Sequence, residues 1–265
     1  MTESAPHGSF PSFDGVQIAY YEWGDQSALA PVVLHHGFVA NTEVNWEVPG
    51  VVAALVAAGR HVYALDARGH GASGKPHDAA SYGEGAMSRD LRMLFDLIGA
   101  PQVHLVGYSM GSLVSLLTAA TDRRITRLVA GGVGASVVEL GGPDSRVVRR
   151  DAIAAALLAD DPATITDRGA AGFRRFADAM GADRLALAAH ASAVHLASLP
   201  LADIAAPTLV LAGASDPVAV RPQVLAAAIP DGRALVIPGD HFTAVTDPAF
   251  APAIVEFLDT AASSS

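Results

Sequence analysis

The residues best suited to chemistry lie in the pentapeptide Gly107-Tyr108-Ser109-Met110-Gly111, between an apolar run and a helical pattern. A serine hydroxyl is a weak nucleophile unless it is held in the open beside a base. A sharp strand-to-helix turn holds it in this way, at the cost of backbone strain. Glycine on either side suits such a turn, because strand and helix approach too closely there for a side chain. Ser109 is therefore the candidate nucleophile.

Two later apolar runs end on the partners that a serine nucleophile needs. Asp216 follows the first of these runs, and His241 follows the second. An imidazole can accept the serine proton near neutral pH, and a carboxylate orients the ring and stabilises its charged form. His241 is favoured over the other histidines because it alone follows both the acid and the last predicted strand. We predict a triad of Ser109, Asp216 and His241.

Two other carboxylates remain open as the acid of this triad. Asp240 is adjacent to His241 in the chain, but adjacent side chains generally diverge, so its carboxylate is badly placed to accept from the ring. Glu139 follows the sixth predicted strand. Both are weaker candidates than Asp216.

The loop His36-Gly37-Phe38 follows another apolar run and is the candidate oxyanion loop. A tetrahedral intermediate needs two N–H donors for its oxyanion. We expect one from the backbone of Phe38 and the other from Met110, which follows the nucleophile. His36, Gly37 and Tyr108 are expected to contact the substrate.

Taken together and in this order, the motifs resemble the α/β-hydrolase superfamily over about residues 10–258. The segments that carry the resemblance are His36-Gly37, Asp66–Ser73, Gly107–Gly111, Asp216–Val218 and Gly239–Phe242. The resemblance implies an α/β-hydrolase fold, with a mostly parallel eight-stranded sheet and helices on both faces. We expect the charges in Asp66–Ser73 to brace a turn without touching substrate.

The pattern of apolar residues supports alternation of strands and helices. Strands are expected near Gly8–Phe13, Val16–Trp23, Pro31–Leu34, His61–Asp66, Val103–Tyr108, Thr126–Gly131, Thr208–Ala212 and Ala234–Pro238. Helices are expected near Pro49–Ala58, Glu84–Ile98, Ser109–Ala120, Arg221–Ala228 and Pro248–Ala261. Such alternation predicts a mostly parallel sheet covered on both faces, with the active site at the carboxyl ends of the strands.

Residues 134–205 break this alternation and separate two parts of the core domain, 1–133 and 206–265. Helices are expected there near Ser145–Leu158, Pro162–Met180 and Asp183–Ala197. By resemblance, the segment is a small helical cap that covers the nucleophile, and Phe173 and Phe176 are expected to line an apolar pocket. Alternatively, these helices only pack on the sheet.

Composition excludes several classes of function. The net charge of −10 argues against nucleic-acid binding, and the doublets Arg123-Arg124, Arg149-Arg150 and Arg174-Arg175 are expected to lie on solvated helix faces. The chain has no cysteine, which excludes disulfides and thiolate metal sites. No apolar run is long enough for a membrane span, and no signal peptide is recognised, so a cytoplasmic location is expected. The oligomeric state stays open.

The serine at position 109 limits the reactions that the resemblance implies. Haloalkane dehalogenases and epoxide hydrolases of the superfamily carry an aspartate there, whereas a serine implies acyl transfer. We expect hydrolysis of small, largely apolar carboxylic esters or lactones, without metal or organic cofactor. The alternatives are a carbon–carbon bond hydrolase of ring-fission products, a cofactor-free perhydrolase and a non-catalytic ligand receptor. A cap arginine facing Ser109 would favour carbon–carbon cleavage, and the sequence leaves Arg146, Arg149 and Arg184 unplaced.

Overall fold

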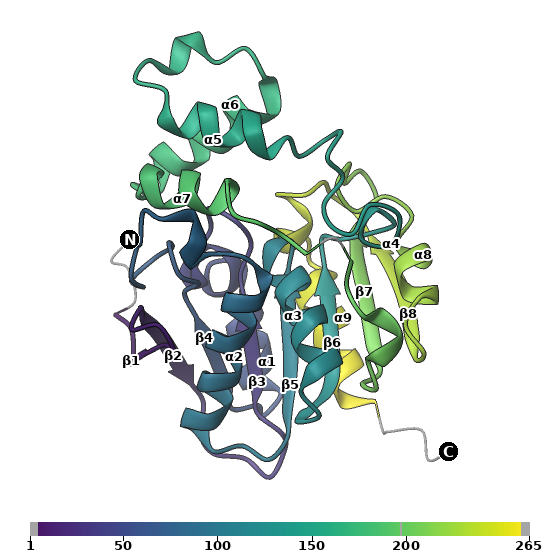
Figure 1. Ribbon diagram of the computed structural model, residues 1–265. Coiled ribbons are helices and arrows are strands. Elements are labelled where there is room, and N and C mark those ends of the chain that lie inside the picture. The colour runs from purple at the N-terminus through teal and green to yellow at the C-terminus, as the bar shows by residue number, and fades with distance from the viewer. Residues whose placement is uncertain (1–4, 197, 261–265) are drawn as a thin grey trace.

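The computed structural model describes residues 5–196 and 198–260, and an eight-stranded sheet forms its centre (Figure 1). The strands are β1 (Gly8–Pro11), β2 (Gln17–Trp23), β3 (Val32–His35), β4 (Val62–Leu65), β5 (Val103–Tyr108), β6 (Ile125–Gly131), β7 (Thr208–Gly213) and β8 (Gly232–Ile237). Their order is β1-β2-β4-β3-β5-β6-β7-β8. Strand β2 pairs antiparallel with both of its neighbours, β1 and β4, and the other strand pairs are parallel. The predicted fold, a mostly parallel sheet within an α/β-hydrolase architecture, is confirmed.

Helices cover both faces of the sheet, which explains why every residue of β3, β4, β5 and β7 is buried. The covering helices are α1 (Val51–Ala57), α2 (Glu84–Ile98), α3 (Met110–Thr121), α8 (Pro222–Ala227) and α9 (Phe250–Asp259). One apolar cluster includes side chains of α2, α3 and α8, and a second includes those of α1 and α9. Each fully buried Leu or Phe in these clusters contributes about 1.5–3 kcal/mol of transfer free energy.

Helix α2 illustrates how the sequence directs this packing. Its buried residues Met87, Leu91, Leu94 and Phe95 recur at the spacing of one helix face. The helix ends at Gly99, whose φ of 63° is a left-handed conformation that glycine adopts without a steric penalty. The resulting apolar stripe packs beside α3 on the sheet.

A helical segment joins β6 to β7 and lies beyond one end of the sheet (Figure 1). It contains α4 (Ser136–Glu139), α5 (Arg150–Leu158), α6 (Arg168–Ala179) and α7 (Arg184–Ala191). The last three helices share a small apolar cluster that includes Ile153, Leu157, Ala177 and Leu187. No strand occurs in the described part of this segment.

The helices of this segment are shorter than the sequence patterns predicted, and an aspartate cap sets the later start of one of them. The helix expected from Pro162 to Met180 begins only at Arg168, where the Asp167 side chain accepts a hydrogen bond from Ala170 N–H. The helix expected from Ser145 begins at Arg150. The one expected from Asp183 ends at Ala191, and its predicted end at Ala197 lies outside the described residues.

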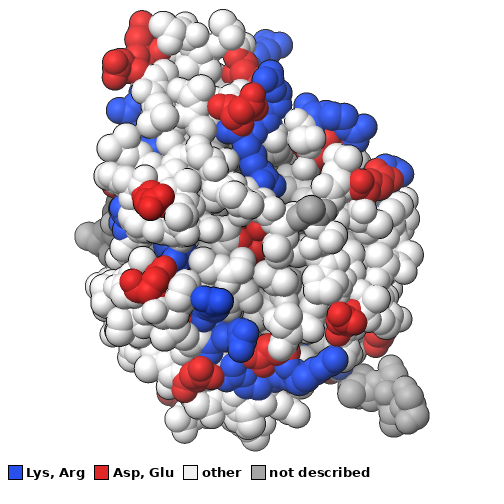
Figure 2. Space-filling view, viewed as in Figure 1, with Lys and Arg blue, Asp and Glu red and all other residues white. Residues whose placement is uncertain are grey.

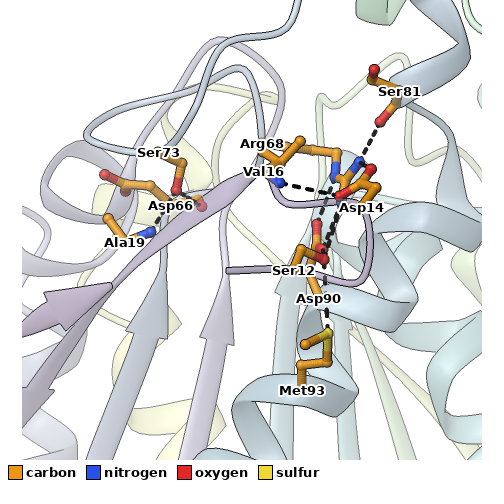
Figure 3. Close-up of polar contacts among 10 residues, drawn as sticks. All are labelled: Ser12, Asp14, Val16, Ala19, Asp66, Arg68, Ser73, Ser81, Asp90 and Met93. Atoms are coloured by element: carbon orange, nitrogen blue, oxygen red, sulfur yellow. Dashed lines mark hydrogen bonds and ion pairs between the residues drawn. The ribbon is translucent and has the colours of Figure 1, made fainter. Parts of the chain in front are cut away.

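The loop after β4 is braced by buried charges (Figure 3). The fully buried Arg68 guanidinium forms ion pairs with Asp90 at 2.8 Å and with Asp14 at 2.7 Å. The Asp66 carboxylate accepts hydrogen bonds from Thr42 N–H and Ala72 N–H. None of the side chains of Asp14, Asp66, Arg68 and Asp90 lines the cavity described below. Every helix among residues 5–196 and 198–260 is too short or too polar to cross a bilayer.

Candidate active site

Ser109 occupies a strained turn between β5 and α3. Its φ of 52° and ψ of −114° are unusual for a residue with a side chain. A Cβ on Gly107 would lie 2.5 Å from the carbonyl oxygen of Gly111. A Cβ on Gly111 would lie 2.1 Å from the carbonyl oxygen of His35 on β3. The turn is therefore so tight that neither glycine leaves space for a side chain.

Side chains from three different loops meet at this turn. His241, after β8, has Nε2 at 2.9 Å from Ser109 Oγ and Nδ1 at 2.8 Å from Asp216 Oδ2. Asp216, after β7, is 3% exposed, and its Oδ1 accepts hydrogen bonds from the N–H groups of Val218 and Ala219. The three predicted residues thus form a continuous hydrogen-bonded chain. In it, Nδ1 donates to the carboxylate while Nε2 accepts from the serine hydroxyl.

The two alternative acids are engaged elsewhere. The Asp240 carboxylate accepts hydrogen bonds from Thr243 N–H and Thr243 Oγ1, which lowers the pKa of Asp240. Glu139 is the last residue of α4 and forms an ion pair with Arg221 at 2.7 Å. Asp216 is the carboxylate that holds His241.

The predicted oxyanion donors flank Ser109. Met110 is the first residue of α3, where N–H groups have no partner within the helix, and Phe38 lies in the loop after β3. Neither N–H has an acceptor among the described residues. The loop is fixed by Asn45, whose Oδ1 accepts a hydrogen bond from Gly37 N–H at 2.8 Å. Asn45 belongs to a single π-helical turn, Glu43–Glu47, that no sequence pattern indicated.

Ser109 faces a cavity of about 160 Å³, which is enclosed by the sheet loops on one side and the helical segment on the other. Six of the predicted contact or oxyanion residues line it together with Ser109: Gly37, Phe38, Tyr108, Met110, Phe173 and Phe176. Its volume is below the range of about 300–1,000 Å³ for pockets that hold drug-sized ligands.

His36 does not line this cavity, which corrects the expectation that it contacts substrate. The side chain is fully buried; Nε2 accepts a hydrogen bond from Ala67 N–H, and Nδ1 bonds to Gly37 O. Because Nε2 accepts a hydrogen bond, the ring is neutral and bridges two loops, and burial lowers the pKa of His36 in the same direction.

The basic doublets also differ from expectation, since only part of each lies in solvent. Arg174 is 4% exposed and donates hydrogen bonds to the carbonyl oxygens of Ala156 and Ala159 at the end of α5. Arg149 is exposed, whereas its neighbour Arg150 lines the cavity. Arg174 and Arg175 lie in different environments because adjacent residues of a helix point about 100° apart around its axis.

The polar end of the cavity was not predicted from the sequence. Glu84, Arg150, His190 and His195 all line it. His195 Nδ1 bonds to Glu84 Oε1 at 2.6 Å. Burial raises the pKa of Glu84, but the hydrogen bonds from His195 and from backbone N–H groups outweigh burial, so the pKa lies below its usual value. Among the described residues no group of three or more His, Asp and Glu side chains has the arrangement of a metal site.

Comparisons with known proteins agree with this architecture. The family model for the alpha/beta hydrolase fold matches residues 30–141. A solved hydrolase from Pseudomonas aeruginosa PA01 superposes with a TM-score of 0.76 and 29% identity, covering 96% of this chain and 98% of that one. The enol-lactonase from Burkholderia xenovorans LB400 has the same fold, with a TM-score of 0.72 and 24% identity over 96% of this chain and 100% of that one.

Sequence relatives match over shorter regions. Epoxide hydrolase A of Mycobacterium tuberculosis (strain ATCC 25618 / H37Rv) is 34% identical over 110 residues, which are 42% of this chain and 33% of that protein. The chain spans about a third of the length of the first curated relatives it matches. The sheet, the strand-to-helix turn and these similarities together show that the chain has the α/β-hydrolase fold.

Proposed function

We propose that this protein is a serine hydrolase that cleaves small carboxylic esters or lactones. The observation that carries the proposal is the unbroken hydrogen-bonded chain from Ser109 Oγ through His241 to Asp216. A serine in this position supports an acyl-enzyme route.

Each group then has one task in the reaction. Ser109 Oγ attacks the ester carbonyl carbon while His241 Nε2 accepts its proton, and Asp216 stabilises the imidazolium that forms. The oxyanion accepts hydrogen bonds from the N–H groups of Phe38 and Met110. The imidazolium returns the proton to the leaving alkoxide, so that an alcohol departs. Water then attacks the acyl-enzyme with help from the same base and releases the carboxylic acid.

The helical segment is proposed to act as a cap, residues 134–205, on a core formed by 1–133 and 206–265. Phe173 and Phe176 of α6 line the same cavity as Ser109, so the segment supplies the wall opposite the nucleophile. A covered site excludes water and strengthens the electrostatic interactions within it. The volume of about 160 Å³ favours short acyl groups.

A fluorophosphonate probe and a p-nitrophenyl ester test the proposal. The probe should add covalently to Ser109, as located by mass spectrometry of digested protein. Ser109→Ala should abolish labelling and lower kcat for p-nitrophenyl butyrate by about 10⁴- to 10⁶-fold, while circular dichroism stays that of the parent. Labelling at another residue, or an Ala variant with parental activity, would reject Ser109 as the nucleophile. Binding of esters without turnover would instead support a ligand receptor.

Carbon–carbon bond hydrolysis of an anionic ring-fission product is a second candidate. It is favoured by one observation, the Arg150 guanidinium at the cavity that holds Ser109. Of the arginines considered from sequence, Arg146 pairs with Asp144 and Arg184 donates to main-chain carbonyl oxygens near the end of α5. Turnover of a dienoate diketo acid at a higher kcat/KM than any ester would favour this candidate over ester hydrolysis.

A further inference from the structure

Arg150 places at the cavity a cation without a hydrogen-bond or ion-pair partner among the described residues. It is the first residue of α5 and is half-buried, and Figure 2 shows basic side chains along the helical segment that contains it. Its guanidinium has no hydrogen bond or ion pair with any residue in 5–196 or 198–260. Burial lowers the pKa of Arg150, although the charge of Glu84 opposes this effect. A guanidinium removed from water without a partner is unfavourable, so this position suits an anionic ligand.

Two histidines that line the same cavity as Arg150 carry nitrogen atoms without a hydrogen-bond partner among the described residues. His190 is 3% exposed, and its Nδ1 has no partner among the described residues. His195 Nε2 is likewise buried and without a partner in the described chain. The two rings stack with centroids 6.1 Å apart. Buried polar atoms are normally hydrogen-bonded, so the two unpaired nitrogen atoms show that the described residues leave polar groups at this end of the cavity incompletely paired.

Glu84, the acid that lines this end of the cavity, is already in use. Its Oε1 bonds to His195 Nδ1 at 2.6 Å, and its Oε2 accepts from Leu196 N–H at 3.2 Å. No ion pair joins it to Arg150 within the described residues. The cation is therefore left for a group that enters from outside.

We propose that Arg150 binds a carboxylate carried by the substrate. The ester or lactone would place its carbonyl at Ser109, its apolar chain along the cavity and its carboxylate at Arg150, with His190 and His195 alongside. A guanidinium recognises a carboxylate through two parallel hydrogen bonds, which a neutral ester cannot accept. The cleavage step rests on the function proposed above, but carboxylate binding does not depend on it.

Monoethyl glutarate and ethyl pentanoate form a matched pair for the test, since both have a five-carbon acyl chain and only the first ends in a carboxylate. Binding of each to the Ser109→Ala variant is measured by calorimetry, so that turnover is not required. Monoethyl glutarate should bind, and adding Arg150→Gln should weaken its binding about 10- to 100-fold, as expected for loss of charge-assisted hydrogen bonds. The effect on ethyl pentanoate should be at least tenfold smaller.

Arg149→Gln is the matched control, because Arg149 is exposed, pairs with Asp151 and does not line the cavity. It should leave the preference for the carboxylate ester unchanged. Equal weakening of both ligands by Arg150→Gln, or no preference for monoethyl glutarate in the Ser109→Ala protein, would overturn the inference. Failure of the hydrolase proposal would appear separately, as absence of probe labelling at Ser109 with carboxylate binding intact.

Discussion

Asp216→Asn should remove nearly all activity, and the reason lies in the donors around the carboxylate. Oδ1 of Asp216 accepts from Val218 N–H at 2.8 Å and from Ala219 N–H at 3.2 Å. In the variant these two donors can face only the amide oxygen, so the amide NH₂ must point toward His241. It would donate to Nδ1 and so place the ring proton on Nε2, where it blocks acceptance of the serine proton.

The expected size of this loss follows from the same geometry. A base held in the wrong tautomer lowers kcat by about 10⁴-fold in serine proteases with this arrangement, which corresponds to about 5.5 kcal/mol of transition-state stabilisation. Asparagine has nearly the same size as aspartate and would pack in the same place, so the unfolding transition of the variant should stay near that of the parent. The assay is kcat for p-nitrophenyl butyrate, together with the rate of inactivation by a fluorophosphonate, which uses the same base.

Asp240→Asn is the control for this experiment. Oδ1 of Asp240 accepts from Phe242 N–H, Thr243 N–H and Thr243 Oγ1, and an asparagine oxygen can accept the same bonds. Its kcat should stay close to the parental value. If Asp240→Asn were the more damaging change, or if Asp216→Asn kept more than about a tenth of the parental kcat, the assignment of the acid would be refuted.

Three further outcomes are expected. Burial lowers the pKa of His35 and of His70 to about 3, so the unfolded chain binds more protons below pH 6.5. The free energy of unfolding should therefore fall as the pH drops from about 6.5 toward 3, by up to about 1.4 kcal/mol per pH unit for each histidine. Urea unfolding at several pH values checks this, and a His70→Gln variant with the same slope would contradict it. Gly111→Ala should prevent folding or cost more than about 3 kcal/mol, because its Cβ would meet the carbonyl of His35, which the sheet holds in place; a melting temperature equal to that of the parent would be the contrary result. Finally, kcat/KM should rise about fourfold per added acyl methylene until the cavity is full and then collapse, and Phe173→Ala or Phe176→Ala should move the optimum to longer chains. Fast turnover of emulsified long-chain triglyceride by the parent would oppose the small-cavity argument.

The sequence predicted the sheet well because its strands are buried on both faces. The bounds expected for Val103–Tyr108 are those of β5, since an apolar run between helix-covered faces has sharp ends. Parallel strands bring their carboxyl ends to one edge, so Ser109, Asp216 and His241 could be placed near one another without any structure.

The cavity wall was harder to predict, since it depends on how loops are placed in space. Asn45 lies in a π-helical turn without a periodic pattern, and nothing local indicates that its side chain supports Gly37. Arg150 follows an exposed arginine in a basic doublet, which is typical of a solvated helix end. Which of the two arginines faces the cavity depends on how the helical segment packs over the sheet. The residues next to the doublet do not determine that packing by themselves.

The helical segment leaves the sheet after β6 and returns at β7, and these two strands are adjacent and parallel. Because the strands are parallel, the segment leaves at the carboxyl end of β6 and returns at the amino end of β7: Gly131 pairs with Leu211, whereas Thr208, where β7 begins, pairs with Leu128. A different insert that spans the distance between these two points could join β6 to β7 without moving the loops after the strands that carry Ser109, Asp216 and His241. The family match ends at residue 141, soon after the segment begins. Under the proposed function, the triad belongs to the sheet loops and the helical segment supplies the opposite wall of the cavity, so a change of insert would alter the substrate and leave the triad in place.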